Sequence, residues 1–206
     1  MKRPTTRERL REEGDPATPR QSASLIVLRD GDRGLDLLLV RRNPAQRFMG
    51  GFWVFPGGAV DAGEDHRAAA VRELAEEAGV TNVEPETLVE YSRWITPERI
   101  AIRFDTRFFL ARAPAGVQPR VDGEECVDMR WTTPRAALEA YARGQLPLVF
   151  PTVHHLEELS AFATVDALLE HARGRDIVAV LPRVLVGCDG DEPRVVLPGE
   201  PGYDDA

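Results

Sequence analysis

The chain has 206 residues, of which 43% are hydrophobic, so it is long enough for one domain with a sizeable core. A net charge of -8 at pH 7 excludes a generic surface for nucleic acid or anionic membranes, because no excess of basic residues attracts polyanions. No apolar run is long enough to span a bilayer, and the N-terminus lacks the apolar core of a secretory signal. We therefore expect a cytoplasmic protein without nucleic-acid or membrane partners. Cys126 and Cys188 are expected to be buried thiols, although a disulfide between them stays open.

The first part of the chain is predicted to be strand-rich and to contain one helix. Residues 1–21 are polar and aperiodic, which predicts a flexible N-terminal tail. Strand-like runs bounded by turn residues then occur at 23–30, 35–42 and 52–55. An alanine-rich helix is predicted over 65–78, because Gly79 is a typical residue just after a helix. The apolar stripe of this helix is predicted to comprise Val71, Leu74, Ala75 and Ala78.

The remainder of the chain continues with strands and then turns helical. Further strands are predicted at 88–95, 101–113 and 126–132. Helices are predicted over 134–144, 152–162 and 164–174, and two short strands within 177–187 and 193–199. The pattern predicts a single α/β domain over 22–206 with a helical C-terminal part at about 134–175.

Three glutamates of the predicted helix carry the chemical signal. At about 100° per residue, Glu73, Glu76 and Glu77 fall within an arc of roughly 100°, with Arg72 as their basic neighbour. An isolated cluster of this kind is usually a solvated acidic face. Grouped carboxylates on a rigid helix are also the hard oxygen ligands that Mg²⁺ and Mn²⁺ prefer. The residues before the helix favour the second interpretation.

A longer pattern extends on both sides of these glutamates. Its defined positions are Gly58, Glu64, Arg72, Glu73, Leu74, Glu76, Glu77, Gly79 and Val80. This spacing resembles the signature of the Nudix hydrolases at every defined position. The resemblance implies an α/β/α sandwich with a mixed sheet, here with a C-terminal helical extension. It also implies hydrolysis within the diphosphate of a nucleoside diphosphate linked to another group, with Mg²⁺ or Mn²⁺ as cofactor.

The resemblance assigns roles to individual residues. Glu73, Glu76 and Glu77 correspond to metal ligands, and Glu73 also to a residue that orients or deprotonates water. Arg72 is expected to hold the glutamates by ion pairing, and Glu64 to stabilise the loop or join an outer metal shell. Glycines without side chains would let backbone carbonyls around Gly57 approach the metal. The resemblance does not decide which residue is the general base, because a later loop supplies Glu124 and Glu125 as alternatives to Glu73. Of these two loop acids, we select Glu125.

The residues before the Nudix signature point to a substrate class. They resemble the additional signature of coenzyme A diphosphatases at Leu38, Leu39, Arg42, Arg47, Gly51, Phe55, Pro56, Gly57 and Gly58. Val40 and Asn43 depart from the usual Thr and from the usual Ser or Ala. The resemblance implies coenzyme A or acyl-coenzyme A as substrate, with Arg42, Arg47, Phe55 and Gly58 at the binding site. Forked arginine donors suit phosphate groups such as the 3'-phosphate of coenzyme A.

Other functions and other residues remain to be weighed. ADP-ribose or a nucleotide sugar is the alternative substrate, and a non-catalytic nucleotide sensor is the alternative from a different class. His154 and His155 are predicted to be structural, since adjacent helical residues point about 100° apart. Trp53, Trp94 and Trp131 are expected in the core or in pocket walls. The helices after residue 134 are expected to cover the site or to form a homodimer contact.

Overall fold

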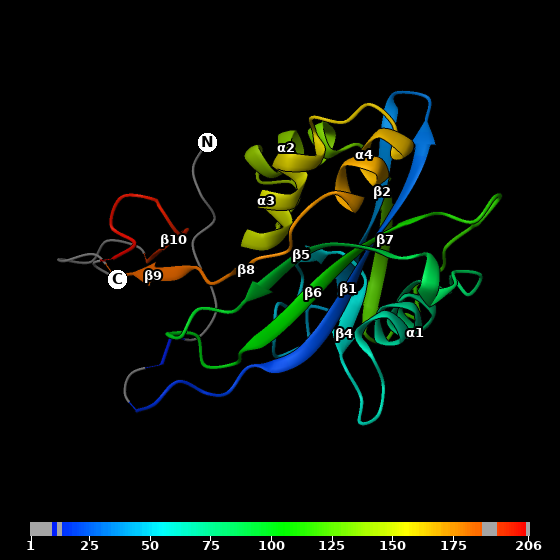
Figure 1. The fold of residues 1–206 in the computed structure, drawn as a ribbon. Helices are drawn as coiled ribbons and strands as arrows, with labels where there is room; N and C mark the ends of the chain where they lie inside the picture. Colours follow the sequence, from blue (N-terminus) through cyan, green and yellow to red (C-terminus); the bar gives the residue numbers. More distant parts are fainter. Residues whose placement is uncertain (1–9, 12–13, 187–192, 205–206) are drawn as a thin grey trace.

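The computed structural model describes residues 10–11, 14–186 and 193–204 and shows one mixed sheet between helices (Figure 1). The strands of this sheet are β1 (Arg20–Gly31), β2 (Gly34–Arg42), β3 (Trp53–Val54), β4 (Gly57–Ala59), β5 (Val89–Ile95), β6 (Phe104–Arg112), β7 (Cys126–Thr132) and β8 (Ala179–Val180). The helices are α1 (His66–Ala78), the short 3-10 helix η1 (Pro85–Thr87), α2 (Pro134–Ala142), α3 (Phe150–Leu159) and α4 (Val165–Arg173). A separate two-stranded sheet, the C-terminal hairpin, consists of β9 (Arg183–Leu185) and β10 (Arg194–Val196).

The main sheet divides along β1. The strand order is β3-β2-β1-β6-β5-β8, with β1 parallel to β6 and antiparallel to β2. β1 pairs with β2 only through residues 28–31, and its residues 22–24 pair with β4 instead. β2 then continues away from β1 and pairs with β3 and β7. The sheet therefore opens between β4 on one side and β3 on the other.

Each face of the sheet has its own hydrophobic core. α1 packs on one face, against alternate residues of β1 such as Ala23, Leu25 and Val27. α2, α3 and α4 lie on the other face, where Ile26 and Leu28 belong to the core (Figure 1). This alternation follows from the two-residue period of a strand. The predicted α/β/α sandwich with a C-terminal helical extension is confirmed.

Several boundaries differ from the sequence prediction. β1 begins at Arg20 rather than residue 23, because its first residues pair with β6. β6 begins at Phe104 rather than residue 101, and α3 begins at Phe150 with a proline in its first turn. Gly57 and Gly58, which follow the predicted strand at 52–55, do not lie in a turn but begin a further strand, β4. Within the predicted flexible tail, Leu10 bridges to Ile100, while residues 1–9 and 12–13 lie outside the described residues.

Helix α1 begins and ends as its sequence indicates, but its buried face is rotated. The Asp65 side chain accepts hydrogen bonds from two backbone amides of the first turn, and Gly79 ends the helix with a φ of 64°. Leu74 and Ala78 are buried as predicted, whereas Val71 and Ala75 are only partly covered. The structure corrects the predicted stripe: the buried side also includes Ala69, Ala70 and Glu77.

Two further observations concern expectations from composition. In the part of the chain that the structure describes, no helix is long and apolar enough to cross a membrane. Cys126 is buried and unbonded to another cysteine, whereas Cys188 lies outside the described residues.

Candidate active site

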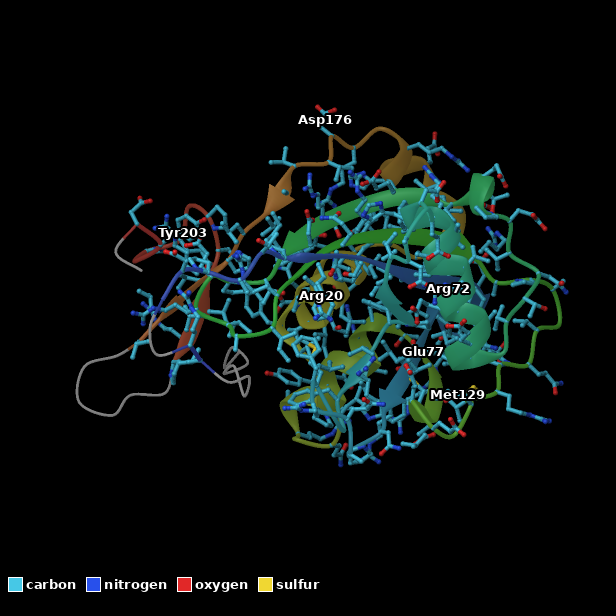
Figure 2. All side chains as sticks on the ribbon, turned by 90° about the horizontal axis from the view of Figure 1, so that it is seen from below. Arg20, Arg72, Glu77, Met129, Asp176 and Tyr203 are labelled. Carbon is cyan, nitrogen blue, oxygen red and sulfur yellow. The ribbon has the colours of Figure 1, made fainter. Side chains whose placement is uncertain are left out.

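Arg72 joins the loop before α1 to the glutamates of that helix (Figure 2). Its Nε and Nη2 donate to both carboxylate oxygens of Glu64, at 3.1 and 3.0 Å. Nη2 also donates to the Ala59 carbonyl oxygen, while Nη1 donates to Glu73 at 2.8 Å and to Glu76 at 3.0 Å. Hydrogen bonding from Arg72 lowers the pKa of Glu64 below its ordinary value. A planar guanidinium thus fixes three carboxylates at once, as its fork geometry allows. We call Glu64, Arg72, Glu73, Glu76 and Glu77 the acidic wall.

The three glutamates of α1 lie at different depths. Their side chains are 12% exposed for Glu73, 59% for Glu76 and 2% for Glu77. A Cβ atom at Gly58 would overlap the Glu73 carboxylate, so the glycine lets this carboxylate lie close to the backbone of β4. Desolvation by burial raises the pKa of Glu73. The acidic wall is therefore a graded set of carboxylates rather than a uniformly solvated helix face.

Glu77 is a buried carboxylate with few compensating contacts. Its Oε2 accepts a hydrogen bond from the Gly57 amide at 2.9 Å, and its Oε1 lies 3.4 Å from Arg42 Nη1. Burial raises the pKa of Glu77 to about 7, against opposing contributions from Gly57 and Arg42. The neighbouring Cys126 thiol is also buried, and desolvation raises its pKa. A further cation beside this carboxylate would favour its ionised form at neutral pH.

The residues of the acidic wall fit a hard divalent cation in donor chemistry. Among the residues that the structure describes, no three His, Cys, Asp or Glu side chains converge into a ready-made cage. Arg72 binds Glu73 and Glu76, and Glu77 turns towards Gly57. Mg²⁺ usually binds through one or two carboxylates together with water and substrate phosphate, so an incomplete protein cage is compatible with it. The buried Glu77 charge is the feature that a cation would compensate.

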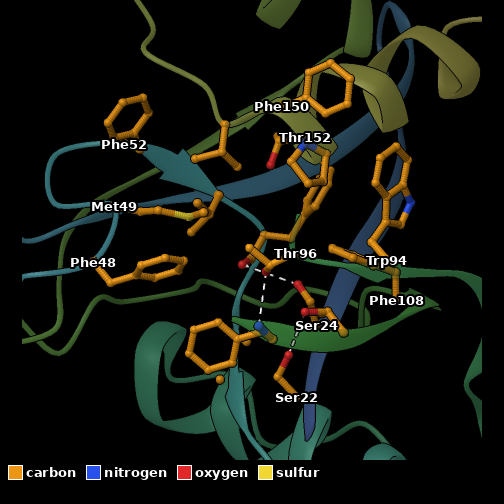
Figure 3. A pocket seen from close by; sticks show the side chains of 18 of the residues that line it. Ser22, Ser24, Phe48, Met49, Phe52, Trp94, Thr96, Phe108, Phe150 and Thr152 are labelled. Carbon is orange, nitrogen blue, oxygen red and sulfur yellow. Dashed lines mark hydrogen bonds between the residues drawn. The ribbon is translucent and has the colours of Figure 1, made fainter. Parts of the chain in front are cut away.

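A cavity of about 480 Å³ lies where the sheet opens (Figure 3). One side of its lining is polar. It includes Glu73 of the acidic wall, Gly57 and Gly58 of β4, and the side chains of Arg42 and Glu125. Ser22, Ser24 and Thr106 continue this polar surface along β1 and β6. The Ser22 and Thr106 hydroxyls are 2.6 Å apart, and Ser24 Oγ donates to the Pro56 carbonyl oxygen at 2.9 Å. The cavity therefore reaches the carboxylates along a strip of hydroxyl groups.

The rest of the lining is mostly apolar and comes from segments far apart in the chain. We call these side chains the apolar wall: Phe48, Met49, Phe52, Trp94, Ile100, Phe104, Phe108, Phe150, Pro182 and Val195. Phe48 and Phe104 pack with ring centroids 5.2 Å apart, and Trp94 and Phe150 with centroids 6.0 Å apart. Figure 3 shows Phe48, Met49 and Phe52 on one side of the cavity and Trp94 and Phe108 on the other. Such a chamber suits an aromatic base or an alkyl group.

Not all of the predicted substrate-binding and general-base residues line the cavity. Arg42, Phe55 and Gly58 line the cavity, although Arg42 also contacts Glu77. Arg47 is exposed and is not part of the lining. Glu125 lines the cavity, and its charge raises the pKa of Glu73 in addition to burial and Glu76, whereas Arg72 lowers it.

The loop that carries Glu125 is held by a local cap. Asp122 accepts backbone hydrogen bonds from Glu124, Glu125 and Cys126. Glu124 is exposed and outside the lining, and its backbone carbonyl accepts from Asn43. Of the two rival loop acids, the structure therefore brings Glu125 alone beside Glu73.

The two histidines of α3 lie in different surroundings. His155 is fully buried among aromatic rings, and its Nε2 is 2.6 Å from Ser92 Oγ. Burial lowers the pKa of His155 to about 3, so the ring is neutral. His154 packs against Trp94 at the surface side of α3. Of the three tryptophans, Trp53 and Trp94 belong to the core opposite α1, and Trp131 packs under the Arg29 guanidinium.

Sequence reasoning missed most of the apolar wall and the hydroxyl strip. The strip had a signal: Ser22 and Ser24 occupy the same face of β1 as Ile26 and Leu28, so an apolar face ends in hydroxyl groups. The apolar wall had no such signal in the sequence, because only the tertiary fold brings Pro182 and Val195 to the same cavity as Phe48.

Comparison with known proteins places the chain in a family. Residues 18–152 match the model of the NUDIX domain. Acyl-coenzyme A diphosphatase NUDT19 of Homo sapiens is 25% identical over 76% of this chain and 70% of its own length. A putative 8-oxo-dGTP diphosphatase of Bacillus subtilis is 30% identical over 62% of this chain and 70% of its length. The crystal structure of a NUDIX hydrolase from Alicyclobacillus acidocaldarius superposes with a TM-score of 0.67, at 28% identity, over 74% of this chain and 96% of its own. The chain belongs to the Nudix hydrolase family and is a pyrophosphohydrolase of that fold.

Proposed function

We propose that the protein hydrolyses the diphosphate of coenzyme A or acyl-coenzyme A, with Mg²⁺ or Mn²⁺ as cofactor. Water adds to one phosphorus and the bridging oxygen leaves, giving 3',5'-ADP and phosphopantetheine or its acylated form. The observation that carries this proposal is that one continuous cavity of about 480 Å³ joins Glu73 and Glu125 to the apolar wall. A substrate with a diphosphate and a long, partly apolar arm suits both parts of that cavity.

The residues of the chain would prepare the site in distinct ways. Arg72 orients Glu73 and Glu76, and the Gly57 amide fixes one oxygen of Glu77. Glu125 faces the cavity near Glu73 and can accept a proton from the attacking water. Arg42 lines the cavity and contacts Glu77, and its guanidinium can donate instead to a phosphate oxygen.

The divalent cation would be held by Glu73, Glu76 and Glu77, with the Gly57 carbonyl as a further oxygen donor and Glu64 in an outer shell. When bound, such a cation screens the charge of the diphosphate and lowers the pKa of coordinated water. The positions of the carboxylates support this assignment, since Glu73 and Glu77 are buried acids that gain from a nearby positive charge.

The choice of coenzyme A among diphosphates has separate support. The human relative NUDT19 is named an acyl-coenzyme A diphosphatase. Adenine could stack on the aromatic rings of the apolar wall, as could the base of ADP-ribose or of a nucleotide sugar. An alkyl group, however, would use apolar surface that these more polar substrates leave uncovered. A homodimer stays a prediction, to be tested by sedimentation of the purified chain.

Parallel assays with purified protein test the proposed substrate class. Coenzyme A, decanoyl-coenzyme A and ADP-ribose are supplied separately with Mg²⁺ or Mn²⁺, and kcat/KM is measured for each. We expect at least about ten-fold preference for the two coenzyme A compounds over ADP-ribose. Glu73→Gln should lower kcat/KM for all three by about 10³-fold, whereas Glu157→Gln, at an exposed glutamate of α3, should leave the rates unchanged.

Each other outcome has a definite meaning. Hydrolysis of ADP-ribose without cleavage of either coenzyme A compound would overturn the proposed substrate and favour the alternative. Tight binding of a nucleotide without turnover by the native protein, at any metal concentration, would instead favour a non-catalytic sensor.

A further inference from the structure

The far part of the cavity is built by residues beyond the matched family domain. The family match ends at residue 152, yet Pro182 and Val195 line the same cavity as Glu73. Both belong to the C-terminal segment that follows α4. The cavity of this chain is therefore completed by a segment that the general fold of the family does not supply.

The main sheet brings this segment into place. β8 is the edge strand of the main sheet and pairs in parallel with β5, with Val180 opposite the lining residue Trp94. Pro182 follows two residues later, where the chain enters the C-terminal hairpin. Strand pairing thus fixes the path of the backbone between α4 and the cavity.

The C-terminal hairpin is also fixed internally. Val195 pairs with Val184 across the hairpin, and both side chains are buried. Tyr203 closes the structure: its hydroxyl donates to the Leu181 carbonyl, and its ring packs against the Arg183 guanidinium. A buried valine held by pairing and packing offers a stable surface to a ligand.

The hairpin lies at the opposite end of the molecule from α1 (Figures 1 and 2). The lining near this end also includes Ile100, whose backbone bridges to Leu10, and Phe104, which pairs with Arg20 at the start of β1. Arg20 also lines the cavity at this end, and because the residue is exposed its charged head can stay in water while its aliphatic stem borders the lining. A substrate with its diphosphate at the acidic wall reaches Val195 only through an extended arm.

We propose that the C-terminal hairpin sets the length of acyl group that the enzyme accepts, with Val195 and Pro182 as the end of the acyl site. This inference rests on the proposed function. It adds specificity-determining residues outside the family signature, and it commits to an aliphatic group as the ligand at this end of the cavity. Apolar contact with buried aliphatic side chains is the interaction that would recognise such a group.

The test compares chain-length profiles of variants at one hairpin. kcat/KM is measured for coenzyme A and for its acetyl, hexanoyl, decanoyl and palmitoyl thioesters. Val195→Trp should shorten the acyl site and lower the ratio of decanoyl to acetyl thioester by at least about ten-fold. Val195→Ala should move the optimum towards longer chains. Val186→Trp adds the same bulk one residue after β9, at a side chain that is 50% exposed and outside the lining, so its profile should match the native one.

Binding provides a second readout that does not depend on catalysis. Dissociation constants for decanoyl- and acetyl-coenzyme A, measured by calorimetry in EDTA, should change in the same ratio as kcat/KM. Melting temperatures identify any variant whose hairpin has lost its structure, in which case Pro182→Trp replaces it. Unchanged chain-length profiles in folded Val195→Trp and Val195→Ala would overturn the inference. A native protein that cleaves no coenzyme A compound would instead refute the proposed function on which it rests.

Discussion

The acidic wall, of which Glu73 lines the cavity, and the apolar wall on the rest of the lining are built in opposite ways. Glu64, Arg72 and Glu73 are close in sequence, and short ion pairs join them. The apolar wall is assembled from the loop before β3, the strands β5 and β6, the start of α3 and the C-terminal hairpin. A compact sequence segment is therefore expected to govern the reaction, whereas distant segments are expected to govern the choice of substrate.

The largest predicted effect is a loss of activity when a carboxylate of the acidic wall is removed. Glu73→Gln keeps the size of the side chain but removes a carboxylate that lines the cavity and binds Arg72. We expect kcat/KM to fall by about 10³-fold for every substrate, because a group of the chemical step is lost. Steady-state kinetics with two substrates checks this. A loss confined to acylated substrates would break the proposed division between the walls.

The second effect concerns stability and pH. The carboxyl of Glu77 has a pKa of about 7 in the folded protein instead of its ordinary 4.5, because of burial. The folded state therefore holds this proton at pH values where the unfolded state has released it, and stability falls as the pH rises from 4.5 to about 7. Above that range, the metal-free Glu77→Gln variant should have a free energy of unfolding higher than the native protein by up to about 3 kcal/mol.

Urea unfolding in EDTA at several pH values measures this difference. The two proteins should be equally stable near pH 4 and diverge up to pH 7. Added Mg²⁺ should stabilise the native protein more than the variant, since only the native carboxylate can be compensated as an anion. Parallel pH profiles of the two proteins would contradict the assigned burial penalty.

A smaller effect is expected for the residue that aligns the acidic wall. Arg72→Lys keeps the charge but cannot reproduce the guanidinium bonds to Glu64, Glu73 and Glu76 together. We expect kcat to fall by about 10- to 100-fold, with little change in the KM ratio between substrates. Arg112→Lys, at an arginine paired with Asp30 and Asp166, is the matched control and should retain native kinetics.

The smallest effect tests recognition outside both walls. Arg47 is exposed and precedes Phe48, which lines the cavity, so its guanidinium could contact the 3'-phosphate of coenzyme A. Arg47→Ala should raise KM about three-fold for coenzyme A and leave dephospho-coenzyme A unaffected, because an exposed ion pair contributes little. Arg135→Ala, at an exposed arginine of α2, serves as control. Equal changes for both substrates would remove Arg47 from phosphate recognition.

The sequence could predict much of the acidic wall, whose residues are close in the chain, but little of the apolar wall, whose residues are far apart. The helix with its Asp65 and Gly79 ends, and the grouping of Glu64 with Arg72, depend on residues close in the chain, so spacing alone could indicate them. The depth of Glu77 could not be predicted, because it depends on Arg42 and Cys126 from two other strands. A helical wheel orients side chains around an axis but does not say how far a partner strand covers them.

The apolar wall lay beyond prediction for a different reason. Phe48 and Phe52 occur in a loop without periodicity, and Val195 is separated from them by most of the chain. Their meeting depends on the division of the sheet at β1 and on the pairing of β8 with β5. Short strands such as β4 and β8 carry too few residues for a pattern to reveal them.

Identification of the bond that is cleaved tests the central claim most directly. Purified protein is incubated with decanoyl-coenzyme A and Mg²⁺ in ¹⁸O-labelled water, and the products are separated by mass. We predict 3',5'-ADP and decanoyl-phosphopantetheine, with one ¹⁸O atom on a phosphate of one product and no reaction in Glu73→Gln. Release of decanoic acid and intact coenzyme A, or of decanoyl-dephospho-coenzyme A with free phosphate, would contradict hydrolysis of the diphosphate at the acidic wall.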